Sequence, residues 1–244
     1  MNDINCWETK FKSCCYAERL LTKISLINKI AECKVDLLEI KKAIYYARKY
    51  HDTQMRQSGE PYYSHPLEVA FNVADHCFKT DILVTSILHD TLEDTELTND
   101  MLKHIFDVNI ANQVEDLTRV KSDRKISSAD IIQRLYVEKK KELLIVKIFD
   151  RLHNMQTIAI KPTKRQKQII LETLQEFLPL AIYLKTLTPE QKLSKLCIHA
   201  NLILEDLNLL FRHQVFSFQD NFQLLSPTFQ NEIAQLYTQK LLDT

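Results

Sequence analysis

The sequence contains a single glycine, Gly59, among 244 residues. Tight turns between β-strands usually need a residue with positive φ, and glycine adopts that conformation most easily. A chain with almost no glycine is therefore expected to join helices through short loops, and we predict an all-α fold. The same scarcity excludes a glycine-rich phosphate loop and a dinucleotide-binding fingerprint, both of which need several glycines.

Composition and charge narrow the choice of partners. Hydrophobic residues make up 45% of the chain and charged residues 26%, which is enough apolar material for a real core. The 32 basic and 32 acidic residues give a formal net charge of +0, so no global positive field attracts nucleic acid or an anionic membrane. No apolar run approaches the ~20 residues that a membrane-spanning helix needs. We expect neither nucleic acid nor membrane as a partner.

The cysteines show no Cys-x-x-Cys spacing, and the first residues do not resemble a signal peptide. Free thiols in a reducing compartment are therefore expected, which favours a cytoplasmic protein. A zinc site built from cysteine is not expected. The six cysteines are Cys6, Cys14, Cys15, Cys33, Cys77 and Cys197.

The chain divides by pattern into three segments. Residues 1–35 are expected to form an N-terminal helical extension, residues 36–200 the main helical domain, and residues 201–244 a C-terminal helical tail packed on or next to it. Leucines of the tail are expected either to pack on the core or to form a homodimer contact. Apolar residues at helical spacing predict helices over residues 37–47, 66–77, 82–92, 99–106, 111–120, 131–136, 142–157 and 163–184.

Several residues predict where helices begin or end. Pro66 is expected at the first helical position, Thr98 as an N-cap, and Pro179 as a bend or an end in the long helix 163–184. Thr188-Pro189 and Ser226-Pro227 are typical helix starts. Residues 121–128 are polar and charged and are expected to form a loop.

Two His-Asp dipeptides occur in the chain, and they differ in their surroundings. His51-Asp52 lies in a polar stretch with no apolar helix behind it, and we do not expect it to bind metal. His89-Asp90 follows the apolar residues Ile87 and Leu88, which place it near the end of a buried helix. Although adjacent residues do not share a helix face, both can reach one ion at a helix end.

Two further residues, His65 and Asp150, complete a candidate metal site. Asp150 follows an apolar run that ends at Phe149, so burying its carboxylate is costly unless it is paired or bound to metal. An ion pair with Arg151 or with a lysine is the alternative. Two imidazoles and two carboxylates suit a divalent cation of borderline softness, which can activate water near neutral pH.

These motifs together resemble the hydrolase domain of the Rel/SpoT family, enzymes that break down the alarmones ppGpp and pppGpp. The resemblance runs from about residue 43 to about residue 184. It rests on several ordered strings, which are more specific than any single His-Asp pair. The strings are residues 56–62, 64–67, 88–90 with 93–95, 150–155 with 157, and 172–174 followed by 178–181.

The resemblance implies an HD-type helical bundle and hydrolysis of the 3′-diphosphate to GDP or GTP and pyrophosphate. It implies that Glu93 and Asp94 orient and deprotonate the attacking water, although from the residues alone they would form an exposed acidic helix end. It also implies that one manganese ion is held by four ligands, namely His65, His89, Asp90 and Asp150.

The resemblance further implies a guanine nucleotide as the substrate. Arg56 would stack its flat guanidinium on the base, which a lysine does poorly. Asn154 and Thr157 would contact the sugar or phosphate, and Tyr62 would either line the base pocket or serve in packing.

Departures from the family pattern put the substrate preference in question. Gln57 stands where a second basic residue is usual, Ile131 and Gln133 replace an asparagine and an arginine, and Lys185 replaces a glycine. The chain resembles a stand-alone small alarmone hydrolase. Three alternatives stay open: an HD-fold phosphohydrolase on another nucleotide such as NADPH, a non-catalytic alarmone-binding module, and a helical scaffold with accidental motifs.

Overall fold

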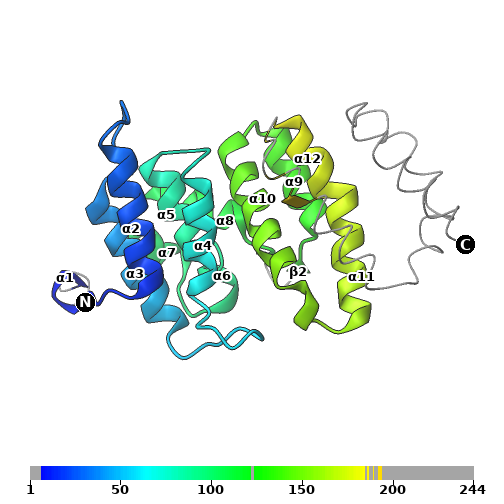
Figure 1. Ribbon diagram of the computed structural model, residues 1–244, viewed down its shortest axis with the longest axis horizontal. Coiled ribbons are helices and arrows are strands. Elements are labelled where there is room, and N and C mark those ends of the chain that lie inside the picture. The colour runs from blue at the N-terminus through cyan, green and yellow to red at the C-terminus, as the bar shows by residue number, and fades with distance from the viewer. Residues whose placement is uncertain (1–6, 122–123, 185, 187–188, 190–191, 194–244) are drawn as a thin grey trace, which may run out of the picture. The chain divides into compact units, whose positions relative to one another are not determined.

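The computed structural model describes residues 7–121, 124–184, 186, 189 and 192–193. The predicted tail 201–244 with its homodimer contact, the helix start at Ser226-Pro227, and Thr188 and Lys185 lie outside the described residues. The chain divides into two compact units, residues 1–160 and residues 161–244, and each is described by itself. The all-α fold is confirmed, and within the described residues no helix is long and apolar enough to cross a membrane (Figure 1).

The first unit is a bundle of helices that includes one short hairpin. Strands β1 (Val120–Lys121) and β2 (Arg124–Lys125) pair antiparallel, so the hairpin begins at the last residue of the helix predicted over 111–120 and continues into the segment 121–128 that was expected to be a loop. The helices are α1 (Trp7–Lys10), α2 (Cys15–Asn28), α3 (Leu37–His51), α4 (Ser64–Val73), α5 (Thr80–Leu88), α6 (Thr91–Asp94), α7 (Asn99–Ile105), α8 (Val108–Leu117), α9 (Ser128–Val137), α10 (Lys141–Gln156) and the 3₁₀ turn η2 (Ile158–Ile160).

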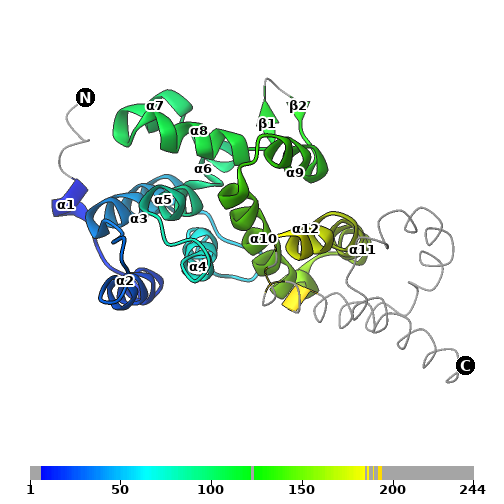
Figure 2. The same ribbon diagram turned by 90° about the horizontal axis from the view of Figure 1, so that it is seen from above.

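Helix α5 is the centre of the core. Every residue from Ile82 to Leu88 is buried, as expected for a helix that is surrounded by others on all sides. It packs against α3, α4, α8 and α10. Helix α4 in turn lies between α2 and α10, as both ribbon views show (Figure 2). The three helices α4, α5 and α10 carry most of the candidate site.

Two predicted helix boundaries are wrong in an informative way. The helix expected over residues 82–92 breaks after Leu88, and a separate short helix starts at Thr91. The Thr91 hydroxyl donates to the Leu88 carbonyl at 2.6 Å, which satisfies a carbonyl that the break would leave free. Helix α4 starts at Ser64, two residues before Pro66, which is tolerated because backbone N–H groups of the first turn have no intrahelical partner.

Other helix ends follow the sequence signals. Thr98 caps α7 as predicted, because its hydroxyl accepts from the Met101 N–H at 3.3 Å. Helix α9 begins with a reciprocal capping box in which Ser127 and Asp130 each accept from the other's backbone N–H.

In the second unit, the long predicted helix is present in three pieces. They are α11 (Thr163–Glu172), a π-helical turn η3 (Thr173–Phe177) and α12 (Leu178–Tyr183). Pro179 has no backbone N–H to donate to the preceding turn, and the wider π turn lies directly before it. Pro179 therefore does not end the helical path, which continues to Tyr183.

Candidate metal centre

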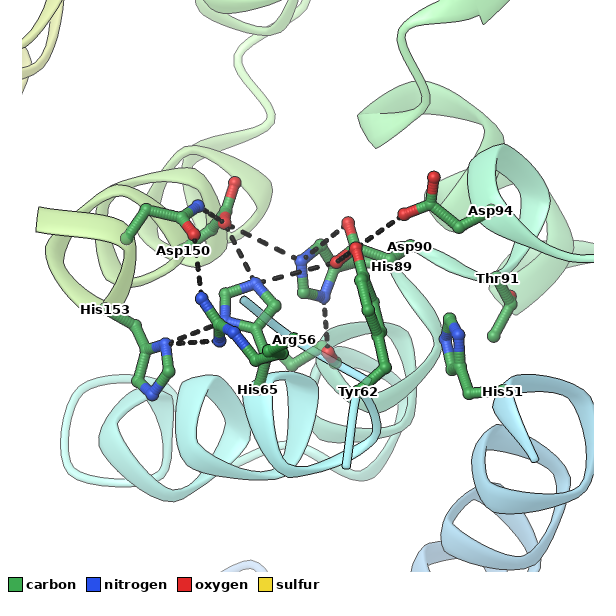
Figure 3. Close-up of polar contacts among 12 residues, drawn as sticks. His51, Arg56, Tyr62, His65, His89, Asp90, Thr91, Asp94, Asp150 and His153 are labelled. Atoms are coloured by element: carbon green, nitrogen blue, oxygen red, sulfur yellow. Dashed lines mark hydrogen bonds and ion pairs between the residues drawn. The ribbon is translucent and has the colours of Figure 1, made fainter. Parts of the chain in front are cut away.

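Three buried side chains from three helical segments point their ligand atoms at one spot. His65 comes from the first turn of α4, His89 follows the last residue of α5, and Asp150 lies in α10. One ligand atom of each lies within 4.8 Å of the others. The Oδ1 atom of Asp150 is 3.2 Å from Nε2 of His65 and 3.9 Å from Nε2 of His89 (Figure 3).

Asp90 completes the group because the chain breaks its helix at this point. Its Oδ1 is 3.0 Å from Nε2 of His89, and its Oδ2 is 3.5 Å from Nε2 of His65. Adjacent residues inside a helix would diverge, but His89 and Asp90 lie between α5 and α6. The structure thus brings together all four residues that the resemblance assigned to a metal ion.

The hydrogen bonding of His89 decides which of its ring nitrogens is available. Nδ1 lies 2.8 Å from the Ser86 carbonyl oxygen, which can only accept, so Nδ1 must carry the proton. Nε2 is buried and makes no well-formed hydrogen bond within the described part of the chain. Nε2 faces Asp90 and Asp150, while Nδ1 has the backbone carbonyl partner that is usual for the other N–H of a metal-binding histidine.

The electrostatics of the group favour positive charge at its centre. Burial opposes the charged form of His89, but the Asp90 and Asp150 carboxylates outweigh it and raise the pKa of His89 to about 10. Burial likewise opposes ionisation of the two carboxyl groups. The pKa of Asp90 is nevertheless lowered by His89, and the pKa of Asp150 is lowered by Lys147 and the histidines. Two imidazoles and two ionised carboxylates fit a divalent cation of borderline softness.

Asp150 also has the lysine partner that was considered as an alternative to metal binding. Its Oδ2 is 3.3 Å from Nζ of Lys147, which is only 3% exposed. Its Oδ1 faces the histidines and accepts from the Asn154 side-chain amide at 2.7 Å. The two oxygens of Asp150 thus have different partners. The ion pair of Oδ2 with Lys147 leaves Oδ1 directed at the candidate metal position.

Glu93 and Asp94, the proposed water-activating pair, lie in α6 just after His89-Asp90. Glu93 is half-buried and accepts from the Arg119 backbone N–H, while burial raises the pKa of its carboxyl group. Asp94 is exposed, and its Oδ2 accepts from the Tyr62 hydroxyl at 2.5 Å. Only Asp94 therefore matches the exposed acidic helix end that the residues alone suggested.

His51 is placed differently from the expectation. It is the last residue of α3 and only 1% exposed, so the prediction of a polar loop with no apolar helix behind it is wrong. Its ring stacks on Tyr62 with centroids 4.6 Å apart, and its Nδ1 lies 2.8 Å from the Gln54 amide oxygen. It is not among the residues whose ligand atoms converge on the candidate site.

The proposed nucleotide-binding residues meet at the end of α10. The Arg56 guanidinium lies in the loop after α3, with Nη2 3.4 Å from Oδ1 of Asn154 and 3.3 Å from Oγ1 of Thr157. Its Nη1 lies 3.0 Å from Nδ1 of His153. Tyr62 instead directs its hydroxyl towards Asp90 and Asp94.

The sequence interpretation missed His153. Its Nδ1 lies 2.8 Å from Nδ1 of the candidate ligand His65, and the two rings are tilted with centroids 4.8 Å apart (Figure 3). Burial, followed by the neighbouring His65 and Arg56, lowers the pKa of His153 to about 3. The spacing of three residues from Asp150 on one helix was the available signal, because such residues share a face.

The departures from the family pattern are distributed over core and surface. Ile131 is fully buried in α9 and therefore serves the core of the first unit. Gln133, two residues later, and Gln57 are exposed.

Comparisons with known proteins identify the family of the chain. Residues 43–186 match the HD domain family, and the chain therefore belongs to that family. Its relatives include a guanosine-3′,5′-bis(diphosphate) 3′-pyrophosphohydrolase of Spiroplasma citri, 37% identical over 170 residues (67% of this chain, 22% of the relative). A GTP pyrophosphokinase rsh of Brucella ovis is 34% identical over 170 residues (66% and 23%). The resemblance to the Rel/SpoT family is thereby confirmed.

The chain spans about a quarter of the length of the curated relatives it matches. A further one, a probable GTP diphosphokinase RSH3 of Arabidopsis thaliana, is 34% identical over 194 residues (75% of this chain, 26% of the relative). A solved structure, described as a metazoan orthologue of SpoT that hydrolyses ppGpp, shares the fold with a TM-score of 0.53. It is 20% identical and covers 67% of this chain and 96% of its own.

Proposed function

We propose that the protein is a metal-dependent hydrolase that removes the 3′-diphosphate of ppGpp or pppGpp. The products would be GDP or GTP and pyrophosphate. The observation that carries the proposal is the convergence of three buried side chains, His65, His89 and Asp150, with the half-buried Asp90. The 3′-pyrophosphohydrolase of Spiroplasma citri supports the choice of substrate, since it is 37% identical over the matched residues.

His65, His89, Asp90 and Asp150 would hold the divalent ion, for which we propose manganese. When bound, such an ion lowers the pKa of a bound water and polarises the substrate phosphate. Lys147, beside Asp150, lowers the pKa of that carboxyl group and so favours its ionised form, which is the form that binds a metal ion.

Asp94 would accept the proton of the attacking water. Its side chain is exposed to the solvent from which water arrives, and the hydrogen bond from Tyr62 fixes one of its oxygens. Glu93, held by the Arg119 N–H, would orient the same water. The water oxygen attacks the phosphorus next to the ribose 3′ oxygen, the bond between that oxygen and phosphorus breaks, and pyrophosphate is released. The proton that Asp94 accepted from the water then passes to the ribose oxygen, which becomes a hydroxyl group.

Arg56, Asn154 and Thr157 would bind the nucleotide. Because their polar groups contact one another at the end of α10, they form one surface rather than three scattered contacts. The flat guanidinium of Arg56 is suited to stacking on guanine. We also propose that the protein acts in the cytoplasm on a free nucleotide, without nucleic acid or membrane as a partner, in keeping with its net charge of +0.

The test is pyrophosphate release from ppGpp by purified protein with manganese, with NADPH as a parallel substrate. The two His-Asp pairs offer matched variants: Asp90→Asn changes the candidate site, and Asp52→Asn changes the other pair at an exposed position. We expect release from ppGpp that is lost in Asp90→Asn and kept in Asp52→Asn. Turnover of NADPH alone would instead assign another nucleotide substrate. Binding of ppGpp without any product would make the protein a non-catalytic alarmone-binding module.

A further inference from the structure

Arg56, His153 and His65 form a continuous line of contacts that leads from the proposed nucleotide surface to the candidate metal centre. Nη1 of Arg56 is 3.0 Å from Nδ1 of His153, and that same Nδ1 is 2.8 Å from Nδ1 of His65 (Figure 3). Both distances are those of hydrogen bonds. Each hydrogen bond needs one proton between its two nitrogens, so the position of each proton can be worked out.

The guanidinium of Arg56 determines where the proton lies in its contact with His153. Arginine has five N–H donors and no acceptor, so in its contact with His153 it must donate. Nδ1 of His153 therefore accepts and carries no hydrogen. Two further contacts hold the guanidinium in place, because its Nη2 also lies within hydrogen-bonding distance of Asn154 and Thr157.

The position of the proton between His153 and His65 follows from that result. Since Nδ1 of His153 carries no hydrogen, His65 must supply the proton in its contact with this atom, and the single lone pair of His153 Nδ1 is shared by the His65 and Arg56 donors. In the neutral form of His65 that has its one proton on Nδ1, the nitrogen Nε2 has the lone pair that a metal ion needs. That Nε2 is the atom 3.2 Å from Asp150 and 3.5 Å from Asp90.

We propose that Arg56 and His153 fix His65 in the tautomer that can bind a metal ion through Nε2. His153 is then a positioning residue that acts through His65, and Arg56 has a second task beside its proposed contact with the base. The arrangement parallels His89, where the Ser86 carbonyl fixes the proton on Nδ1. Partners of this kind orient the ring and raise the basicity of the ligating nitrogen.

The inference rests on the proposed metal site, so its test measures metal binding rather than turnover. Manganese alone is titrated into the metal-free full-length protein, and free Mn²⁺ is followed by electron paramagnetic resonance. His153→Leu removes the acceptor, whereas His153→Asn can present an amide oxygen at the position of Nδ1. His104→Leu, which removes an exposed histidine of α7, is the matched control.

We expect His153→Leu to weaken Mn²⁺ binding by about 10- to 100-fold, the usual effect of losing such a partner. His153→Asn is expected to retain most of the affinity, and His104→Leu all of it. A folded His153→Leu protein that binds Mn²⁺ as tightly as the wild type would overturn the inference. A His153→Asn protein that binds Mn²⁺ as weakly as His153→Leu would also overturn it. Asparagine keeps a hydrogen-bond acceptor, so the acceptor would then not be what supports Mn²⁺ binding.

Arg56→Met provides a second test that does not alter α10. Arg56 lies in the loop after α3 and is only partly buried, so the variant is expected to fold. Without the Arg56 donor, neutral His153 can carry its one ring proton on Nδ1 and donate it to Nδ1 of His65, which favours the His65 tautomer with its proton on Nε2. The Mn²⁺ affinity is therefore expected to fall although no nucleotide is present. An unchanged affinity would overturn the role of Arg56. If the wild type itself bound no Mn²⁺, the proposed metal site would fail, and that result is distinct from either variant outcome.

Discussion

The hydroxyl of Tyr62 lies 2.5 Å from Oδ2 of Asp94 and 3.2 Å from Oδ2 of Asp90. One hydroxyl therefore joins the proposed water-activating carboxylate to a candidate metal ligand. The tyrosine ring is itself held by stacking on His51. Burial and then the two carboxylates raise the pKa of Tyr62, so the hydroxyl keeps its proton and remains a donor.

Tyr62→Phe is expected to lower kcat more than it changes KM. The variant keeps the ring that stacks on His51 but loses the hydrogen bond that fixes Asp94. Hydrogen bonds to charged groups contribute about 1.5–3 kcal/mol, which corresponds to roughly 10- to 100-fold in rate if the bond persists in the transition state. Steady-state kinetics with ppGpp would measure both constants, with Tyr63→Phe as the neighbouring control. A rise in KM at constant kcat would place Tyr62 in the base pocket instead.

Asp150→Asn is expected to destabilise the metal-free protein by roughly 3–5 kcal/mol, because it leaves the buried Lys147 ammonium without its carboxylate. The comparison uses urea unfolding in the presence of a chelator. The double variant Lys147→Met/Asp150→Asn should recover much of the loss, since no unpaired charge remains.

The control for this charge pair is the ion pair between Lys140 and Asp116, which is at 2.6 Å but more exposed. Asp116→Asn is expected to cost less than about 1 kcal/mol, because Lys140 is partly exposed to solvent and keeps Glu138 as a second partner at 2.6 Å. Equal losses in Asp150→Asn and Asp116→Asn would show that burial of Lys147 does not have the assumed effect.

Gly59→Ala is expected to destabilise the protein by about 1–2 kcal/mol through the backbone alone. Gly59 has φ +86°, a left-handed conformation that costs residues with a side chain about that much. A Cβ atom at this position would meet no atom within 4 Å, so steric contact adds nothing.

The Gly59 turn also holds Arg56, whose backbone N–H donates to the Glu60 carbonyl at 2.8 Å. Gly59→Ala should therefore raise KM for the nucleotide as well. Gly59→Asn should be milder in both respects, because asparagine tolerates the left-handed region better. The free energy of unfolding in urea would measure the backbone strain, with Ser58→Ala as the control. A Gly59→Ala protein as stable as Ser58→Ala would contradict the predicted strain.

The stability difference between the wild type and His51→Gln is expected to shrink as the pH falls from about 7 to about 5. Burial lowers the pKa of His51, although Gln54, Asp90 and Asp94 oppose this shift. Below the ordinary histidine pKa of about 6.5, the unfolded chain takes up a proton that the folded protein does not, so the wild type loses stability. The variant lacks this titration. Chemical denaturation at several pH values, with His104→Gln as an exposed control, would detect it; a constant difference would refute the assignment.

Local sequence signals predicted much of the fold. The single glycine excluded a sheet protein, and the Thr98 cap and the apolar spacing placed most helices within a few residues of their observed bounds. The identity of the four candidate ligands was also predicted from the sequence, because the order and the residues of several motifs resembled one family. The break after Leu88 could not be predicted from the sequence, because the residues from Ile82 to Leu92 continue the apolar pattern without a helix-breaking residue.

The network around the site was decided by the tertiary structure. Arg56 and His153 are 97 positions apart, and His65 and His153 are 88 positions apart, so no pattern within one helix relates them. The burial of His51 likewise depends on what packs against the end of α3. Helical periodicity is a local property that repeats every three to four residues, and it determines which face of a helix is apolar. Which distant polar groups meet depends on how α4, α5 and α10 pack, and that packing fixed the hydrogen-bonding partner of each histidine.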